Sequence, residues 1–221
     1  IERCVVSQIV RAPGAYFSGE IDQVSGRMLY RAELRPLRGS WLEFEVARSD
    51  VLSVRIDRRR KYPATLFLRA LGIEDDEQIH RLFSQVNNNP EHDYVAATLG
   101  RDQSHNRNEA LLELYRKIRP GEPAILENAA SLLTNLFFNS RRYDLGKVGR
   151  YKLNKRLGLN FPNEHEYWVL TQEDVVATIK YMINLQNRIG VVDDIDHLGN
   201  RRIRRVGELV TNIAFRNGLL K

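Results

Sequence analysis

Residues Arg27 to Ile56 read RMLYRAELRPLRGSWLEFEVARSDVLSVRI and carry the strongest indication of the fold. Apolar residues alternate with polar or charged ones along three segments of this stretch, a pattern typical of strands with one buried face. The expected buried positions are Met28, Tyr30, Ala32, Leu34, Leu42, Phe44, Val46, Leu52, Val54 and Ile56. Turn-forming residues separate the segments at 38–40 and 49–50. The pattern, which begins near Val5, predicts an antiparallel meander over about residues 5–56.

After Pro63 the apolar residues follow a helical period instead. Strands first and helices afterwards predict an α+β fold, with a bundle-like helical part over about residues 63–190. Residues 87–108 are rich in Asn and other polar residues and predict a loop. The expected helices are Ala64–Ala70 closed by Gly72, Glu74–Phe83, one capped by Asn108 and ending at Pro120, one with Pro123 in its first turn, and one from Thr171 to Gly190.

Residues 191–221 are expected to form a connecting segment and a C-terminal helix, so that residues 1–221 make one domain. The stripe of that helix is Val206, Leu209, Val210 and Ile213. This stripe continues without a clear helix stop signal, which indicates that the chain is a piece of a larger protein. We assign no register beyond Thr211.

Composition narrows the class of protein. The chain has 221 residues, 43% of them hydrophobic, and no apolar run approaches the roughly 20 residues of a membrane span. The one cysteine, Cys4, cannot form an internal disulfide, and no leader-like segment is present, so we expect a cytoplasmic protein. The formal net charge of +6 favours a polyanionic partner where the charge clusters. Three clusters are found, at 55–61 (Arg55, Arg58, Arg59, Arg60, Lys61), at 141–156 (Arg141, Arg142, Lys147, Arg150, Lys152, Lys155, Arg156) and at 201–205 (Arg201, Arg202, Arg204, Arg205).

The third cluster belongs to the segment Asp193–Arg204, DDIDHLGNRRIR. Unpaired charges are costly to bury, so these side chains either pair with one another or meet a charged ligand. A divalent-metal site is a third possibility, but adjacent carboxylates point in different directions, which disfavours it. The sequence has no phosphate loop, dinucleotide fingerprint or serine elbow. We therefore expect no catalytic residue and no metal site.

The same segment resembles the large β subunit of bacterial DNA-directed RNA polymerase. Six further blocks resemble that subunit in the same order: VVSQIVRAPGAYFSGEID from Val5, RGSWLEFEV from Arg38, VRIDRRRKYPATLFLRALG from Val54, LYRKIRPGEP from Leu114, RRYDLGKVGRYKLNKRLGL from Arg141 and VGELV from Val206. The chain is identified by this resemblance as a fragment of the β subunit, from its lobe region.

The resemblance implies a role in transcription: one wall of the downstream DNA cleft, gripping the non-template strand. The catalytic aspartates and their Mg²⁺ would lie in the partner subunit β′, so the nucleotidyltransferase as a whole would be the enzyme, and this fragment would carry no cofactor. Implied partners are DNA, the subunits β′, α and ω, the σ factor and transcription factors, with no membrane, in the bacterial cytoplasm at the nucleoid. Matched motif by motif, the DNA-binding residues would be Arg11, Trp41, Arg58, Arg119, Ile195, Asp196 and Arg201.

Each of these residues also has a purely structural interpretation. A single Trp is commonly a core residue, although base stacking by Trp41 is what the resemblance implies. Asp196 can accept hydrogen bonds from a flipped-out guanine, or it can pair with Arg201 or Arg202. The alternative function is a stand-alone α+β nucleic-acid-binding regulatory protein.

Overall fold

The computed structural model describes residues 2–211, 213 and 218. The chain forms two compact units, one from residues 13–193 and the other from the two terminal segments, residues 1–12 and 194–221. That residues 1–221 make one domain stays a prediction.

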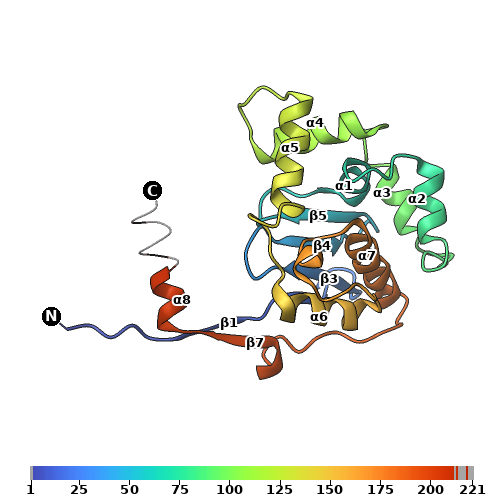
Figure 1. The fold of residues 1–221 in the computed structure, drawn as a ribbon. Helices are drawn as coiled ribbons and strands as arrows, with labels where there is room; N and C mark the ends of the chain where they lie inside the picture. Colours follow the sequence, from blue (N-terminus) through green and yellow to red (C-terminus); the bar gives the residue numbers. More distant parts are fainter. Residues whose placement is uncertain (1, 212, 214–217, 219–221) are drawn as a thin grey trace. The chain divides into compact units, whose positions relative to one another are not determined.

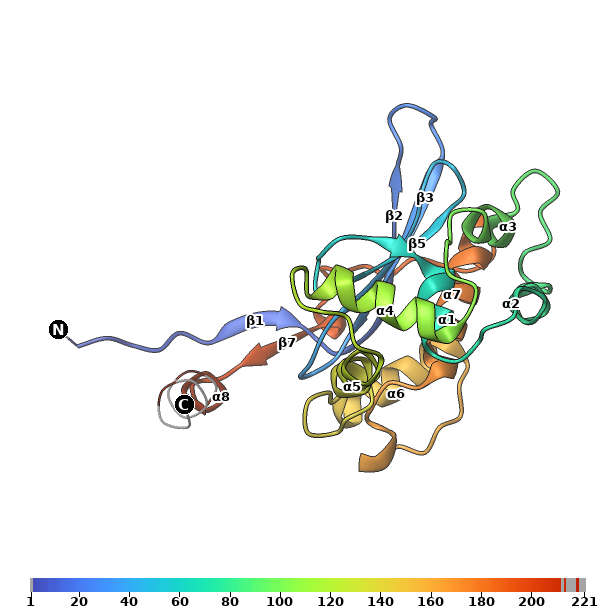
Figure 2. The same ribbon diagram turned by 90° about the horizontal axis from the view of Figure 1, so that it is seen from above.

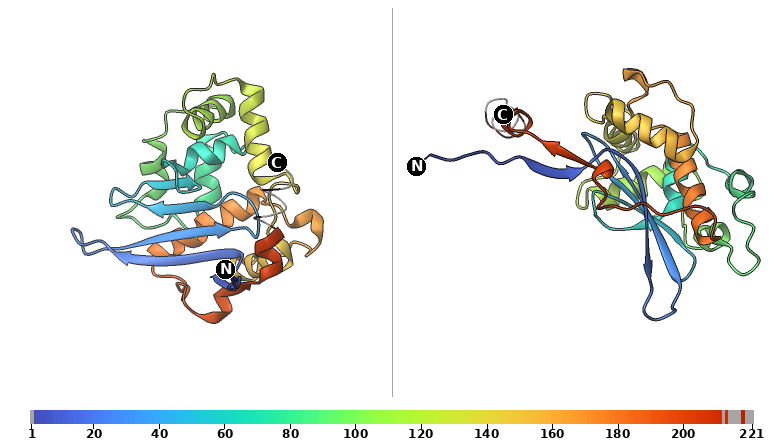
Figure 3. Two further views of the ribbon diagram at one scale, coloured as in Figure 1. Left: turned by 90° about the vertical axis from the view of Figure 1, so that its left-hand side faces the viewer. Right: turned by 90° about the horizontal axis from the view of Figure 1, so that it is seen from below.

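The larger unit is built on a five-stranded antiparallel sheet whose strands pair in chain order. The left panel of Figure 3 shows these strands side by side. The strands are β2 (Gly14–Ile21), β3 (Met28–Arg35), β4 (Leu42–Val46), β5 (Leu52–Ile56) and the short β6 (Tyr62–Pro63). The meander predicted over about residues 5–56 is therefore confirmed in type and order from Gly14 to Ile56.

Register follows the hydrophobic alternation. Leu34 pairs with Leu42, Phe44 pairs with Val54, and all four side chains are fully buried. A slip of one residue would turn these apolar side chains outward, so their burial fixes the register. The other face is polar and carries Arg31, Glu33, Arg35, Trp41, Glu43, Glu45 and Arg55.

Helices cover the apolar face (Figures 1 and 2). Helix α1 (Ala64–Ala70) contacts β5, α6 (Gly146–Leu157) contacts β2, and α7 (Gln172–Gln186) contacts β3. The remaining helical elements of this unit are α2 (Asp76–Phe83), α3 (Tyr94–Leu99), α4 (Arg107–Ile118), α5 (Leu126–Phe137) and the 3₁₀ turn η1 (His165–Tyr167). Together with the meander they form the predicted α+β fold.

One buried arginine joins α6 to α7. Arg150 and Asp174 have fully buried side chains and pair through two bonds of 2.7 and 3.0 Å. The guanidinium also donates to the carbonyl oxygens of Tyr167 and Val169, each at 2.6 Å. Asp174 further accepts from the backbone N–H of Thr171 and so completes the capping box of α7. We call this group the Arg150 hub. Because Arg150 is buried and paired in this hub, it contributes no surface charge to the second basic cluster.

Four details of the helical prediction were wrong. The expected loop over residues 87–108 contains α3, which begins at an Asp93 cap and buries Tyr94 and Val95. Helix α4 is capped by Asn106, two residues before Asn108, because Asn106 accepts from the N–H of Glu109. Helix α5 begins at Leu126, so Pro123 precedes it. Helix α7 ends at Gln186, since Arg188 already has a positive φ of 63°, ahead of Gly190.

The smaller unit contains a two-stranded antiparallel sheet of β1 (Gln8–Arg11) and β7 (Arg201–Arg204). The 3₁₀ turn η2 (Leu198–Asn200) precedes β7, and helix α8 (Val206–Val210) follows it. The prediction that the meander begins near Val5 was wrong here, because β1 pairs with β7, about 190 residues further along the chain. A partner so distant in sequence leaves no trace in local periodicity. Of the predicted apolar stripe of the C-terminal helix, Leu209 is buried, whereas Val206, Val210 and Ile213 are exposed. Most residues after Thr211 lie outside the described residues.

Candidate nucleic-acid interface

Trp41 stands on the polar face of the sheet, one residue before β4. Its backbone is held by Asp57: the Trp41 N–H donates to Asp57 Oδ1 at 2.8 Å, and the Asp57 N–H donates to the Trp41 carbonyl at 3.1 Å. The residue is half-buried, so the interpretation of Trp41 as a core residue does not hold. A half-exposed indole on a charged surface is suited to stacking on a planar ligand.

Two arginines lie over the Trp41 ring. The Cζ atom of Arg35 is 4.0 Å from the ring centroid, and that of Arg58 is 5.1 Å from it. Both distances fall within the range of cation–π attraction. We call Trp41, Arg35 and Arg58, with Glu33, Glu43 and Asp57 beside them, the Trp41 corner.

Each of these arginines is tied to a glutamate. Arg35 Nε lies 2.9 Å from Glu33 Oε2, and Arg58 Nε lies 3.6 Å from Glu43 Oε1. Glu33 and Glu43 are directly opposite each other in the β3–β4 register, where two like charges would repel without cations beside them. The arginines therefore stabilise the polar face of the sheet as well as covering the ring.

Backbone strain presents Arg58 to the ring. Asp57 and Arg58 have φ values of 48° and 57°, and the Arg59 N–H donates to the Ile56 carbonyl at 3.0 Å, which closes a tight turn. Left-handed backbone costs a non-glycine residue about 1–2 kcal/mol. Strain of this kind is concentrated at functional sites, which supports a role for this turn beyond chain reversal.

Arg119, another predicted site residue, is the C-cap of α4. Its guanidinium lies 3.2 Å from Glu122 Oε2, and the hydrogen bond with Glu122 raises the pKa of Arg119. The neighbouring Ile118 carbonyl accepts a hydrogen bond from Arg59, which joins the end of α4 to the turn that carries Arg58. Beside this junction is a hollow of about 560 Å³, lined mainly by basic residues: Arg59, Arg60, Glu113, Arg116, Lys117, Ile118 and Pro120.

The other predicted site residues belong to the smaller unit. Arg11 is directly opposite Arg201 in the β1–β7 register, and Arg201 forms an ion pair with Asp196. The Asp196 side chain remains 82% exposed. The backbone N–H of Asp196 donates to Asp194 Oδ1 at 2.9 Å, within a local turn. Ile195 is half-buried. This unit thus brings Arg11, Arg201 and Asp196 together, as the larger unit brings Trp41 and Arg58 together.

Acidic neighbours reduce the net positive charge of all three basic clusters, the second through Asp174 and Asp193. Glu45 on β4 binds both Arg55 (3.1 Å) and Lys61 (2.8 Å). Arg202 bonds to both carboxylate oxygens of Glu208 at 2.7 Å, so the alternative pairing of Arg202 with Asp196 does not form; the hydrogen bond from Arg202 lowers the pKa of Glu208. These acids are distant in sequence or face the cluster only after folding, so the sequence overstates the free positive charge.

No metal-binding arrangement is found among the residues that the structure describes, where no three His, Cys, Asp or Glu side chains gather as ligands. The carboxylate of Asp193 instead binds Arg156 at 3.1 Å and the N–H of Phe17 at 2.8 Å, and His197 Nδ1 accepts from the N–H of Gly199. Over the same described residues, none of the helices is long and apolar enough to span a membrane.

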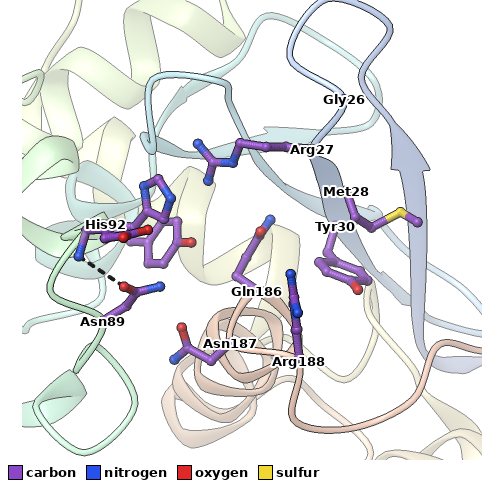
Figure 4. A pocket seen from close by; sticks show the side chains of 11 residues that line it. Gly26, Arg27, Met28, Tyr30, Asn89, His92, Gln186, Asn187 and Arg188 are labelled. Atoms are coloured by element: carbon purple, nitrogen blue, oxygen red, sulfur yellow. Dashed lines mark hydrogen bonds between the residues drawn. The ribbon is translucent and has the colours of Figure 1, made fainter.

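A polar pocket of about 570 Å³ lies elsewhere on the larger unit, and its described lining includes none of the predicted site residues (Figure 4). Arg27, from the β2–β3 hairpin, and His92, from the loop between α2 and α3, point into it. Both bind Asp50, at 2.9 and 2.8 Å. Since Asp50 already binds both Arg27 and His92, the pocket supplies no separate argument about function.

Sequence reasoning missed Arg35, and the β3–β4 register is what would have revealed it. Because Leu34 pairs with Leu42, continuing the register by one residue places Arg35 opposite Trp41, on the same face. The role of Asp57 in holding the Trp41 backbone and the link from Arg59 to Ile118 depend on the fold and leave no signal in the sequence.

Comparisons with known proteins agree on one family. The model of RNA polymerase Rpb2, domain 2, matches residues 11–204. Proteins named DNA-directed RNA polymerase subunit beta match from Chloroflexus aggregans (48% identical, 100% of this chain and 20% of the relative), Trichodesmium erythraeum (51%, 96% and 18%) and Dehalococcoides mccartyi (48%, 100% and 17%). The chain thus spans about a fifth of the length of the curated relatives it matches.

Proposed function

Because this chain belongs to the RNA polymerase Rpb2 domain 2 family, we propose that it forms a wall of the downstream DNA cleft in a DNA-directed RNA polymerase and holds the non-template strand there. The observation that carries this proposal is the Trp41 corner. A half-exposed indole flanked by two guanidinium groups has the two elements of single-strand binding: an aromatic surface for a base and positive charge for phosphates.

The remaining residues have complementary roles in the proposal. Arg58, Arg119, Arg11 and Arg201 contact phosphates, because a guanidinium binds them in a two-pronged fork. Ile195 packs against a base or sugar, and Asp196 reads a base. The hollow next to Arg119, lined in part by Arg59, Arg60, Arg116 and Lys117, would add further positive charge for phosphates. Nucleotidyl transfer itself would be carried out elsewhere in the enzyme, with Mg²⁺ held by β′; the partners are DNA, β′, α, ω and σ.

The alternative of a stand-alone regulatory protein gains no support. The three relatives reported above are all named as polymerase β subunits and match nearly the whole of this chain. No feature of either described unit favours the alternative over a polymerase module.

Replacement of Trp41 by alanine tests the proposal. Base stacking contributes about 1–3 kcal/mol, so a polymerase with Trp41→Ala should lose its open promoter complexes roughly 5- to 150-fold faster. The measurement is the lifetime of heparin-challenged open complexes, with the melting temperature of the chain measured in parallel. Trp168→Phe is the matched control, because Trp168 is also half-buried but donates to Asn163 within its own loop. An unchanged lifetime in a normally assembled Trp41→Ala enzyme would contradict the proposal.

Asp196 provides a second test, of base reading. Guanine presents two adjacent N–H donors on its pairing edge, and Asp196 can accept them while keeping Arg201, since each carboxylate oxygen has two lone pairs. A lost two-pronged contact costs about 1–3 kcal/mol of discrimination. Asp196→Ala should therefore shorten lifetimes mainly on promoters with guanine at the contacted non-template position.

The comparison needs wild type, Asp196→Ala and Arg201→Ala on all four bases. Arg201→Ala, a change at a phosphate contact, should weaken every promoter alike. Equal losses for all four bases with Asp196→Ala would show that Asp196 only orients Arg201.

A further inference from the structure

We propose that Arg35 is a positioning residue that holds the indole ring of Trp41 ready for stacking before the DNA binds. The inference rests on the proposed function, because it assigns Arg35 a role in the same site. It concerns a residue that contacts the ring and not the nucleic acid.

The first observation is how closely Arg35 lies against the ring. Its Cζ atom is 4.0 Å from the centroid of Trp41, the distance of two groups in van der Waals contact. The Arg35 side chain is only 15% exposed, although it lies on the polar face of a sheet. A guanidinium in this position restricts the rotamers available to the indole.

The second observation is how Arg35 itself is held. Its Nε lies 2.9 Å from a carboxylate oxygen of Glu33, a normal length for a charge-assisted hydrogen bond. Glu33 is two residues away on the same face of β3, so regular strand geometry sets the direction of the Arg35 side chain. The support therefore comes from the rigid sheet and not from a loop.

Arg58 differs in each of these respects. It lies further from the ring, at 5.1 Å, its side chain is 67% exposed, and its distance of 3.6 Å to Glu43 exceeds that of a hydrogen bond. When a base approaches the indole, Arg58 is the arginine that can move aside and bind a phosphate, while Arg35 stays. The two arginines thus have different roles: Arg35 orients the ring, and Arg58 contacts the strand.

Orienting the ring in advance lowers the entropy lost on binding. Immobilising one rotamer-rich side chain costs a factor of about 2 to 10 in affinity, so loss of Arg35 should shorten open-complex lifetime by about that factor. The loss should be smaller than that caused by Trp41→Ala. It should also vanish when Trp41 is absent, because Arg35 acts only through the ring.

The experiment uses the whole polymerase reconstituted with four β variants: Arg35→Ala, Trp41→Ala, the double variant, and Arg31→Ala as the control. Arg31 lies on the same face of β3, four residues before Arg35, and pairs with Glu20, so its removal deletes the same charge without touching the ring. Open-complex lifetime is measured over a series of salt concentrations. A 2-aminopurine base placed at successive non-template positions reports stacking through its quenched fluorescence.

The expected result has three parts. Arg35→Ala shortens the lifetime by about 2- to 10-fold with an unchanged salt dependence, it reduces the 2-aminopurine quenching that Trp41→Ala abolishes, and it adds nothing to Trp41→Ala. Arg31→Ala changes none of these readouts.

Other outcomes would overturn the inference in distinguishable ways. A loss that adds to that of Trp41→Ala and flattens the salt dependence would make Arg35 a phosphate contact. A normal lifetime with Arg35→Ala, while Trp41→Ala shortens it, would remove the positioning role and leave the proposed function standing. No effect of Trp41→Ala would overturn both.

Discussion

The Arg150 hub and the Trp41 corner are both built on arginine, but they use it in opposite ways. Arg150 is fully buried, and its guanidinium is bound by Asp174 and two carbonyl oxygens. Arg58 is two-thirds exposed, lies on a strained turn, and makes one loose ion pair and one ring contact. The first arrangement is closed to any ligand because the whole guanidinium is buried, whereas the second leaves most of its donors available.

Burial and backbone strain separate structural arginines in this chain from candidates for ligand binding. A buried guanidinium is tolerated only when its hydrogen bonds are satisfied, so burial itself identifies a structural role. An exposed arginine gains little stability from its ion pair, about 0–1 kcal/mol. A strained backbone that holds such an arginine over an aromatic ring therefore needs an explanation other than stability, and the proposed nucleic-acid binding would supply one.

The largest expected effect is at the hub. Arg150→Ala leaves the carboxylate of Asp174 buried without its partner, which should cost about 3–5 kcal/mol. The melting temperature of the chain should fall by roughly 6–20 °C. Lys147→Ala, on the exposed side of the same helix, is the control and should change stability by no more than about 0.5 kcal/mol. A loss below about 1 kcal/mol for Arg150→Ala would mean that the hub is not a structural centre.

A smaller effect, with an unusual sign, is expected at the corner. Arg58→Ala and Arg58→Gly remove the same ion pair and ring contact, but only glycine relieves the left-handed strain at φ 57°. Arg58→Gly should therefore be more stable than Arg58→Ala by about 1 kcal/mol, the reverse of the usual order. Chemical denaturation of both variants measures this difference. If alanine proves the more stable, the turn is not strained and loses its value as a sign of function.

The contrast also shows how far sequence reasoning reaches. The alternation from Met28 to Ile56 predicted the meander because each strand pairs with its neighbour in the chain, and Thr171 marked the start of α7 because a cap is a local signal. The pairing of β1 with β7 and the burial of Arg150 depend on contacts between distant segments. From the sequence alone, Arg150 looks like any other member of a basic cluster, since Asp174 reaches it only in the folded chain.

The same limit applied to the candidate site. The resemblance placed Trp41, Arg58 and Asp196 among the site residues, and the fold brings Trp41 to Arg58 and Asp196 to Arg201. Arg35 was recoverable only after the register of β3 and β4 was known. Contacts of these residues with DNA stay predictions.

The most direct test of contact with DNA is site-specific photocrosslinking from position 41. A polymerase whose β subunit carries p-benzoylphenylalanine in place of Trp41 would be irradiated in open complexes with separately labelled strands. The same substitution at Trp168, which is half-buried and bound to Asn163, provides the control. The proposed contact predicts a crosslink from position 41 to the non-template strand alone, at a narrow set of positions in the bubble, and none from position 168. Open complexes that form normally and give no crosslink from position 41, or give crosslinks equally to both strands, would contradict it.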